Sequence, residues 1–400
     1  MKTNAIIKKI ATNITAAGHV CDSCVGRQFA LLIKAKTNAE RGKKVREVLA
    51  SEFKKGNIEA DLSKLFGRRK GGPESRQNCV LCENVLENIP KMAEKPIKIL
   101  KKMGFTTFMV GIKMSDSLVM NEEALWERAG MKYSEPLKSE ISRELSALVE
   151  KKTGKKIRRD KPDVIITFDI QKGDAEIFSN PILIYGEYKK FERGLPQTSS
   201  PRYKQSVEDI IAKPFMRFTT ASSHTLHAQG REDKEARCLA WRRFVLEIKQ
   251  PMLRAVDLKK MKNEINKNSK VKVARLRYSD REEIFSIKTK NPFKVYRVLV
   301  DFEGPVENAD RLKKILGTIK QSTPSRILGQ KPDKTKYKKV KSIKWKRINT
   351  KRYQFEISVE SGLYLQELIT GDGGRTKPSV AHLLDNRAEL KEFDLVGIED

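Results

Sequence analysis

Two pairs of cysteines constrain the fold of this chain more than any other feature of its sequence. "HVCDSC" holds Cys21 and Cys24, and "NCVLC" holds Cys79 and Cys82. A two-residue gap lets both sulfurs of a pair bind one metal ion about 2.3 Å away, and two pairs complete a tetrahedron. The pairs must therefore meet in the fold, and the long stretch between them, with a helix expected over 39–53, becomes an insertion.

The chemistry of these positions predicts a structural Zn²⁺ rather than a catalytic one. Four thiolates fill the coordination sphere and leave no open position for a substrate. A redox dithiol is the alternative for either pair alone, and His19, two residues before Cys21, is an alternative ligand. Cys238 lies beside an expected strand and is interpreted as a packed small residue. Five cysteines in 400 residues do not indicate a disulfide framework.

The charge balance points to a polyanionic partner. Lys and Arg number 82 against 51 acids, which gives a formal net charge of +31. Such a field attracts nucleic acid, although a surface that merely serves solubility is an alternative. No apolar run approaches the roughly 20 residues of a membrane helix, and the first twenty residues lack the pattern of a secretion signal. We therefore expect a cytoplasmic protein with no membrane association.

The periodicity of apolar residues predicts a helical N-terminal half with a small β-rich part. A basic loop is expected at 66–78, and residues 84–153 carry apolar positions three to four apart, as in amphipathic helices, with breaks at Pro90 and Pro96. Residues 162–195 hold short β-rich runs. The Pro-, Ser- and Gly-rich segment 194–206 is the expected linker.

From about residue 215 the C-terminal half alternates apolar strand-like runs with helices. Together with the expected linker, this predicts two regions, 1–205 and 206–400. "LYLQELI" is among the apolar runs, and "ADRLKKILGTI" is expected to be a helix. The segment 329–352 is strongly basic, with Tyr337 and Trp345 interleaved. It suits a surface that lies along phosphates, and a solvated hairpin is the alternative.

The motifs of common enzyme chemistries do not occur in the sequence. There is no Walker loop, no strand-linked GxGxxG and no HExxH, and the four histidines are scattered. An acid is therefore the expected reactive group. Asp233 lies in "GREDKEAR", between Arg231 and Arg237 and directly before the apolar run 242–248. Neighbouring arginines would keep it ionised and oriented. A solvated surface turn is the alternative that composition alone favours.

The segment "AQGREDKEARCLAWRRFVLEI" resembles the catalytic-aspartate motif of pseudouridine synthases. More specifically, it resembles the archaeal-eukaryotic tRNA pseudouridine synthases that act on positions 54 and 55 of the TΨC arm, in their archaeal type. Other stretches resemble this family in the same order along nearly the whole chain. They are "CDSCVGRQFA" and "CVLC" for its zinc knuckles, "KPDVIITFDI" and "YGEYKKFERGLPQT" for its N-terminal THUMP-related RNA-binding region, "FKVYRVLV" for its active-site tyrosine, and "SGLYLQELITGDGGRTKPSVAHLL" for its closing motif.

The resemblance implies an α+β protein. A pseudouridine synthase catalytic domain, with a mixed, largely antiparallel sheet and helices, follows a zinc-containing, THUMP-related RNA-binding region. It implies that Asp233 is the catalytic carboxylate and that Tyr296 is catalytic and lies against the flipped base. It also implies substrate contacts by Tyr364, Arg231 and Arg375. The expected partner is the TΨC arm of tRNA, bound by a monomer without any small-molecule cofactor. Without the resemblance, ordinary strand packing would be the favoured interpretation of Tyr296.

Three positions depart from the family pattern. Gln366 occupies the place where related enzymes carry a Lys or Arg that pairs with the catalytic carboxylate, so Arg375 and Arg231 become the candidate partners of Asp233. Ser322, in "QSTPSR", and Glu187, in "YGEYKK", stand where arginines are expected. Both concern expected RNA contacts and bear on the choice between positions 54 and 55.

Two other functions remain open from the sequence. A non-catalytic tRNA-binding protein or chaperone on the same fold would share the composition, the cysteines and the basic strand. It would differ at Asp233 and Tyr296. A THUMP-linked methyltransferase or thiolase would need a cofactor loop, and none is found.

Overall fold

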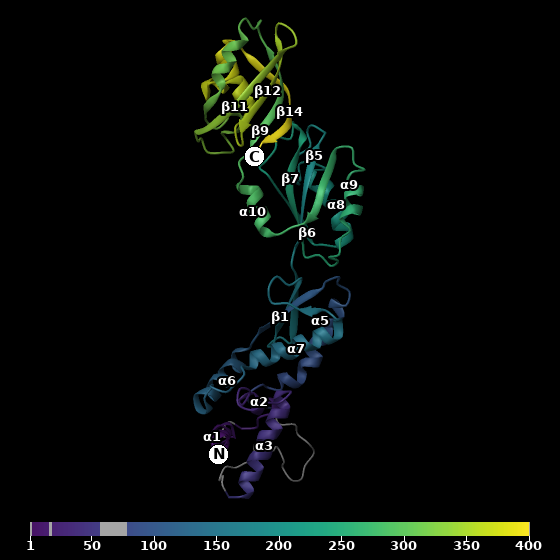
Figure 1. Ribbon diagram of the computed structural model, residues 1–400, viewed down its shortest axis with the longest axis vertical. Helices are drawn as coiled ribbons and strands as arrows, with labels where there is room; N and C mark the ends of the chain where they lie inside the picture. The colour runs from purple at the N-terminus through teal and green to yellow at the C-terminus, as the bar shows by residue number, and fades with distance from the viewer. Residues whose placement is uncertain (1, 16–17, 57–77, 400) are drawn as a thin grey trace. The chain divides into compact units, whose positions relative to one another are not determined.

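The computed structural model describes residues 2–15, 18–56 and 78–399 (Figure 1). The basic loop expected at 66–78 lies outside the described residues except for Asn78. The chain forms two compact units, Met1–Asn180 and Pro181–Asp400. Among the described residues, no helix is both long and apolar enough to cross a membrane.

The first unit places helices against a four-stranded sheet of order β2-β1-β3-β4. β1 runs parallel to β2 and β3, and β4 returns antiparallel to β3. Its described helices are α1 (Lys2–Thr15), α2 (Asp22–Arg27), α3 (Asn38–Lys54), α5 (Val85–Leu100), α6 (Asp116–Ala129) and α7 (Leu137–Thr153). Its strands are β1 (Thr107–Lys113), β2 (Lys156–Ile157), β3 (Val164–Asp169) and β4 (Asp174–Ser179).

Three segments of this unit can be compared with the secondary structure that periodicity predicted for them. The helix expected over 39–53 is confirmed as α3, which begins where the Thr37 side chain accepts a hydrogen bond from Glu40 N. The breaks expected at Pro90 and Pro96 are wrong, because α5 runs through both with its apolar face buried. Residues 107–113 form a strand inside the stretch expected to be helical, since their side chains alternate between buried and half-buried.

The second unit is built on a ten-stranded sheet of order β13-β10-β11-β12-β9-β14-β7-β5-β8, with β6 paired to β7. Its neighbouring strands are antiparallel except for β14 and β7, so the predicted mixed, largely antiparallel sheet is confirmed. The strands are β5 (Ile182–Lys190), β6 (Ser223–Ala228), β7 (Arg237–Lys249), β8 (Val271–Tyr278), β9 (Phe293–Phe302), β10 (Gly317–Gln321), β11 (Lys336–Arg347), β12 (Arg352–Glu360), β13 (Thr376–Lys377) and β14 (Ala388–Glu399).

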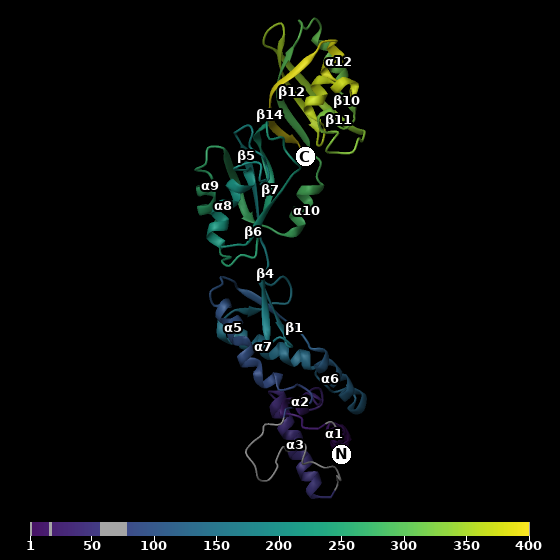
Figure 2. The same ribbon diagram turned by 180° about the vertical axis from the view of Figure 1, so that it is seen from behind.

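Helices cover this sheet in separate groups. α8 and α9 pack on β5, β7 and β8, whereas α10 packs on the opposite face of the same strands (Figures 1 and 2). α11, α12 and η1 close a second core over β9–β12. Their bounds are α8 (Val207–Thr219), α9 (Leu258–Ile265), α10 (Arg281–Thr289), α11 (Leu365–Thr370), α12 (Val380–Leu384), and the 3₁₀ helices η1 (Ala309–Ile315), η2 (Ser325–Ile327) and η3 (Asp372–Gly374).

The long strand β7 joins the two halves of the sheet and leaves a gap at one edge. β5 pairs along one edge of β7. On the other edge, β6 pairs with residues 244–249, and β14 pairs with Arg237 and Cys238. Residues 239–243 have no strand partner there. The connection from β6 to β7, residues 229–236, leaves the sheet at this gap, so Asp233 lies between the two cores.

The segment between the expected regions belongs to the second unit. The units divide between Asn180 and Pro181, earlier than the boundary predicted at 205, because β5 pairs with β7 and β8. The segment 194–206 is not a free linker. Leu195 packs into the core beside α8, and the buried Ser206 caps that helix by accepting a hydrogen bond from Asp209 N.

Two further segments differ from expectation in secondary structure. "LYLQELI" forms the helix α11 rather than a strand, because Leu365, Leu368 and Ile369 are spaced to bury one helical face. "ADRLKKILGTI" divides into η1 and the strand β10. The apolar runs alone could not separate these alternatives, since short runs fit either structure.

Candidate active site and metal site

Asp233 lies on the connection between β6 and β7 with its carboxylate exposed. Gly230 turns the chain there with a φ of +70°, a conformation that favours glycine. Asp233 Oδ1 accepts a hydrogen bond of 3.0 Å from Glu235 N, and its carbonyl accepts one of 3.2 Å from Ala236 N. These contacts make a tight Asx turn that holds the carboxylate at the surface.

A buried lysine fixes the backbone of this loop. Lys190, at the end of β5, has no exposed surface, and its Nζ donates to the carbonyls of Leu195 at 2.9 Å, Asp233 at 3.2 Å and Lys234 at 3.0 Å. An ammonium group has three protons, so these three carbonyls satisfy it. Lys190 therefore determines where the peptide of Asp233 lies.

The neighbouring acid, Glu232, points in the opposite direction. Its side chain is 4% exposed, and its carboxylate lies 3.6 Å from both Lys190 Nζ and Arg242 Nη1. Arg242 is fully buried on β7 and also donates to the carbonyls of Gln229 at 2.8 Å and Gly230 at 2.7 Å. Glu232 thus anchors the loop from inside, while Asp233 stays accessible.

A third buried cation, Lys294 on β9, lies near the same loop. It is 6% exposed, and its side chain makes no hydrogen bond or ion pair with any described residue. Burial, reinforced by the charge of Arg242, lowers the pKa of Lys294 to about 8. Lys190, Arg242 and Lys294 together outnumber Glu232, so the interior behind the loop carries an excess of positive charge.

Tyr296 lies two residues after Lys294, on the same face of β9. Its half-buried ring packs with Cys238 and Leu395, and its centroid is 6.3 Å from that of Phe393. Burial raises the pKa of Tyr296 well above its usual value, and the charge of Asp233 adds to this rise. The structure therefore brings Tyr296 within electrostatic reach of Asp233, with its hydroxyl protonated.

The backbone of Tyr364 is held by a buried amide. Gln321 Nε2 donates to Tyr364 O at 3.0 Å, and Gln321 Oε1 accepts from Tyr364 N at 2.7 Å. These two bonds fix the start of α11 to the end of β10. The backbone of Tyr364, the tyrosine expected to contact the substrate, is therefore held in a fixed position.

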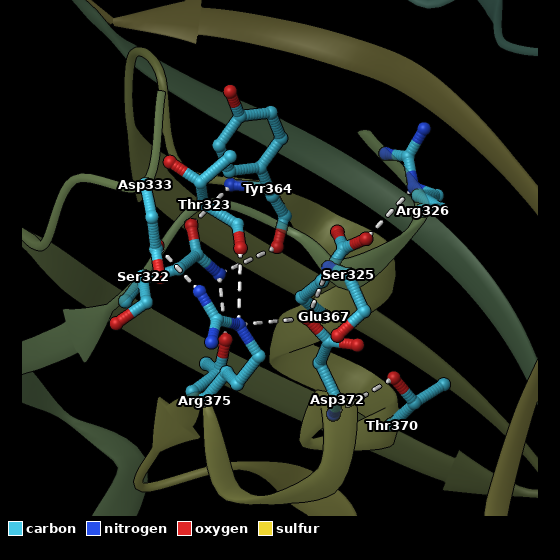
Figure 3. A network of polar contacts seen from close by, with 12 residues as sticks. Ser322, Thr323, Ser325, Arg326, Asp333, Tyr364, Glu367, Thr370, Asp372 and Arg375 are labelled. Carbon is cyan, nitrogen blue, oxygen red and sulfur yellow. Dashed lines mark hydrogen bonds and ion pairs between the residues drawn. The ribbon is translucent and has the colours of Figure 1, made fainter. Parts of the chain in front are cut away.

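Arg375, a candidate partner of Asp233, makes hydrogen bonds to other residues of the second unit. Its Nε donates to Thr323 O at 3.1 Å, and its Nη2 lies 2.5 Å from Asp333 Oδ1 (Figure 3). Both partners belong to the connection between β10 and β11. Arg375 therefore fastens this connection to the junction between η3 and β13.

Arg326, on η2, is the cation that sequence reasoning missed. Its Nε donates to the buried carboxylate of Glu367 at 2.8 Å (Figure 3). Burial opposes the shift, but the bond to Glu367 and then the charge of Asp233 raise the pKa of Arg326. Arg231 and Gln366 are both exposed, and their side chains bond to no described residue. The one available signal was an arginine four residues after Ser322 in "QSTPSR".

The four paired cysteines meet in the first unit. Cys21 and Cys24 lie at the start of α2, and Cys79 and Cys82 lie in the turn before α5. Their sulfurs all fall within 4.8 Å of one another, and Cys21 Sγ and Cys82 Sγ are 3.7 Å apart. Sulfurs of a tetrahedral site with bonds of about 2.3 Å lie about 3.8 Å apart, so this arrangement fits one metal ion.

Local packing brings the two cysteine pairs together. A Cβ on Gly26 of α2 would lie 1.8 Å from Asn38 O, and one on Gly42 of α3 would lie 1.9 Å from Asp22 O. Glycine is therefore required where these helices touch. Val80 N donates to His19 O at 2.9 Å and joins the pairs, although His19 is not part of the sulfur cluster. Cys238 is buried elsewhere, in the core beside Tyr296, as predicted for a packed small residue.

Comparison with known proteins matches both units. The family described as "Pus10, C-terminal" matches residues 183–399, and "Pus10 THUMP domain, archaeal" matches residues 92–169. The predicted THUMP-related module is thereby confirmed. The stretch "YGEYKKFERGLPQT", assigned from the sequence to that module, lies instead on and after β5, in the C-terminal match.

Whole-length relatives give the same result. The tRNA pseudouridine synthase Pus10 of Pyrococcus furiosus is 34% identical, over 99% of this chain and 98% of its own length. Those of Methanothrix thermoacetophila and Thermofilum pendens are 32% and 33% identical, over 97% and 95% of this chain and 93% of each relative. A solved Cbf5–Nop10–Gar1 complex covers 53% of this chain and 48% of its own, at 15% identity and a TM-score of 0.31, which is too low to support an argument. Matches of this length and identity across both units mean that the chain belongs to the Pus10 family of tRNA pseudouridine synthases.

Proposed function

We propose that this chain converts uridine 54, uridine 55 or both in the TΨC arm of tRNA to pseudouridine, with Asp233 as the essential carboxylate. The observation that supports this most directly is the way in which the loop holds Asp233. Lys190 and the Asx turn hold it rigidly, and its carboxylate is open to a substrate. A binding protein would have no need to present an accessible acid so firmly.

The reaction is an isomerisation, so it needs no redox or group-transfer cofactor. The bond between the ribose and N1 of uracil breaks, the base turns, and a bond forms from the same ribose carbon to C5. The proton that leaves C5 is matched by one that N1 gains. Asp233 supplies the carboxylate that engages the sugar or base, and Tyr296 supplies an aromatic ring against which the base lies.

RNA binding is proposed to follow from aromatic and cationic side chains of the second unit. The target base must leave its stacked arm to reach Asp233. Tyr364 provides an aromatic surface, and Arg231 is free to reach a phosphate. β11 presents exposed lysines beside Tyr337, which is 66% exposed. This pattern is suited to a strand that follows phosphates.

The choice between positions 54 and 55 is proposed to depend on two substituted contacts. The hydroxyl of Ser322 bonds that of Thr335 at 3.0 Å. Glu187 accepts from the Tyr185 hydroxyl and lies 3.1 Å from Arg275. Both side chains are therefore engaged within the protein, and neither offers the cation expected at its position.

We also infer that the four-cysteine cluster holds a structural Zn²⁺. Four thiolates around Zn²⁺ carry a net charge of −2, and Arg27, fully buried on α2, lies close enough for its charge to interact with Cys24. The cation therefore offsets part of that charge. The enzyme is proposed to act as a monomer on tRNA, with both units contacting the RNA.

The test compares single-turnover pseudouridine formation on an unmodified tRNA transcript. We expect Asp233→Ala to abolish the reaction while the Kd for tRNA changes less than about 2-fold, because the exposed carboxylate stabilises nothing but its own turn. Glu235→Gln is the matched control, since it removes an exposed acid two residues away and should keep wild-type rates. Full activity of Asp233→Ala would rule out this mechanism.

A further inference from the structure

A second candidate site lies on the face of the sheet that carries α10. A cavity of about 580 Å³ opens between β5, β7, β8 and α10, within the size range of small-molecule and nucleotide sites. Successive residues of a strand point to opposite faces. Arg242 lies behind the Asp233 loop, whereas Arg243, the next residue of β7, lines the cavity. Neither Asp233 nor Tyr296 lines the cavity, and Gln229, which does, is the first residue of the connection that carries Asp233.

One wall of the cavity holds a buried donor without a partner. Gln229 is 3% exposed and lines the cavity, and its Nε2 has no hydrogen-bond partner. A buried amide in this state is costly, by about 1–3 kcal/mol, and is rarely retained without a purpose. A ligand with a carbonyl or imine acceptor would satisfy it.

A second wall provides a flat cationic surface. The guanidinium of Arg277 lies over the ring of Tyr185, 4.2 Å from its centroid. Two bonds to Glu283, of 2.6 and 2.8 Å, hold it in that plane. Arg277 is about half exposed, so the face turned away from Tyr185 is open. Guanidinium planes of this kind stack on unpaired bases of RNA.

The rim of the cavity supplies positive charge. Arg275 lies 3.1 Å from Glu187 and keeps its side chain exposed, and the side chain of Lys290 bonds to no described residue. Arg243 lines the same opening. These cations stand at the edge, whereas Glu187 is buried, so a phosphate at the rim meets mainly positive charge.

We propose that this cavity binds one unpaired nucleotide of the substrate tRNA, outside the hairpin that holds the target uridine. Its base lies on Arg277, a base acceptor receives the amide proton of Gln229, and its phosphate meets Arg275 and Lys290. The inference rests on the proposed function to the extent that the ligand is tRNA. It requires no catalysis, so RNA binding alone tests it.

The first experiment removes the unpartnered donor. Gln229→Met keeps the length of the side chain, so the free protein should melt at the wild-type temperature or higher. The Kd for an unmodified tRNA transcript should rise about 2- to 10-fold, the worth of one hydrogen bond. A lowered melting temperature with unchanged tRNA affinity would show a structural amide and overturn the proposal.

The second experiment tests stacking, with a matched control on the other face of the sheet. Arg217 on α8 bonds Glu264 through both carboxylate oxygens, as Arg277 bonds Glu283. Arg277→Ala should raise the Kd for full-length tRNA about 10-fold, and Arg217→Ala should leave it within about 2-fold. Arg277→Lys keeps the positive charge but loses the planar guanidinium group, so this variant should bind tRNA nearly as weakly as Arg277→Ala. Equal affinities of the Arg277 and Arg217 variants would contradict the proposal.

The RNA itself separates this site from the active site. With a synthetic hairpin of the TΨC arm alone, Gln229→Met and Arg277→Ala should bind like wild type, because the nucleotide they contact is missing. A loss of equal size on hairpin and full-length tRNA would place the contact in the target arm and overturn the proposal. Absence of pseudouridine formation by wild-type protein would contradict the proposed function without affecting this result.

Discussion

Glu232 and Asp233 are adjacent acids in opposite environments. Glu232 is buried among Lys190 and Arg242, whereas Asp233 is exposed on a turn that the same lysine fixes. The pair therefore divides two tasks that one carboxylate could not perform together. The first anchors the loop in the core, and the second remains free to meet a substrate.

Lys294 gives a prediction for the pH dependence of stability. Burial lowers its pKa from the usual 10.5 to about 8, so between these values the folded protein binds fewer protons than the unfolded chain. The contribution of Lys294 to stability therefore rises as pH increases from about 8 to 10.5. Lys294→Met should stabilise the protein by about 1–3 kcal/mol at pH 7. The substitution removes a buried charge, and the methionine side chain is of similar length.

The measurement is thermal or urea unfolding of both proteins at pH 7 and at pH 10. The gain of Lys294→Met should shrink at the higher pH, where the wild-type amine is already neutral. Lys346→Met on β11, where the lysine is exposed, is the control and should show no such difference. A destabilised Lys294→Met at pH 7 would mean that the ammonium group has a partner in solution.

Arg326 gives the second prediction at this scale. Its guanidinium is held by Glu367 and interacts with the charge of Asp233, so its loss should affect turnover more than tRNA affinity. Arg326→Gln should lower the rate of pseudouridine formation about 10- to 100-fold at saturating tRNA, the range for a bond to a charged group. Arg311→Gln on η1, another arginine of the same unit, is the control. A rate within 2-fold of wild type would remove Arg326 from the site.

The residues of the proposed site were only partly predictable. Asp233 and Tyr296 belong to local motifs that can be recognised in one sequence. Lys190 and Arg326 act through carbonyls and carboxylates that lie 43 and 41 residues away along the chain. Such partners depend on how the strands pair. Their roles emerge only in the folded chain.

Strand β5 positions the loop by ending at Lys190, which leads to a prediction at the scale of elements. Lys190→Met should remove the three carbonyl contacts, so residues 229–236 should become mobile and pseudouridine formation should fall at least 10-fold. Lys189→Met is the matched control. The neighbouring lysine points away, with its Nζ 4.8 Å from the ring centroid of Trp241.

Hydrogen exchange of the backbone amides in this loop checks the cause. Exchange should accelerate for residues 229–236 in Lys190→Met and stay unchanged in Lys189→Met. The amide of Ala236, which donates to Asp233 O, is the most direct reporter. Normal loop protection combined with normal activity would show that Lys190 does not position Asp233.

Elements with strong periodicity were predictable, and short apolar runs were not. β3, β7 and β9 follow their alternating patterns. α11 carries the same residue types as a buried strand, and its start is fixed by the two hydrogen bonds between the Gln321 side chain and the backbone of Tyr364. Contacts between residues far apart in the sequence determine the structure of such short runs, and a local sequence pattern does not contain those contacts.

The metal site gives a prediction for the whole molecule, because each unit has its own core. Purified protein should contain about one zinc per chain, and Cys79→Ala with Cys82→Ala should release it. The first unit should then unfold at lower temperature, while the second keeps its own transition. Metal analysis by mass spectrometry and calorimetry would measure both effects.

Cys238→Ala is the control for this experiment, since that thiol is buried far along the chain from the cluster and should not alter zinc content. Protein purified without chelator that holds no zinc would contradict the site.

The organisation into two units was predictable from composition. The position of the division was not, because the apolar run of β5 follows β4 closely and only its pairing with β7 and β8 assigns it to the second unit.

The central claim is that this chain acts on tRNA through Asp233, and pseudouridine mapping of an unmodified tRNA transcript tests it most directly. After incubation with the wild-type protein, we predict pseudouridine at position 54, position 55 or both. No pseudouridine should form at either position with Asp233→Ala. A transcript that wild-type protein binds but leaves unmodified would contradict the account and favour a tRNA-binding protein on the same fold.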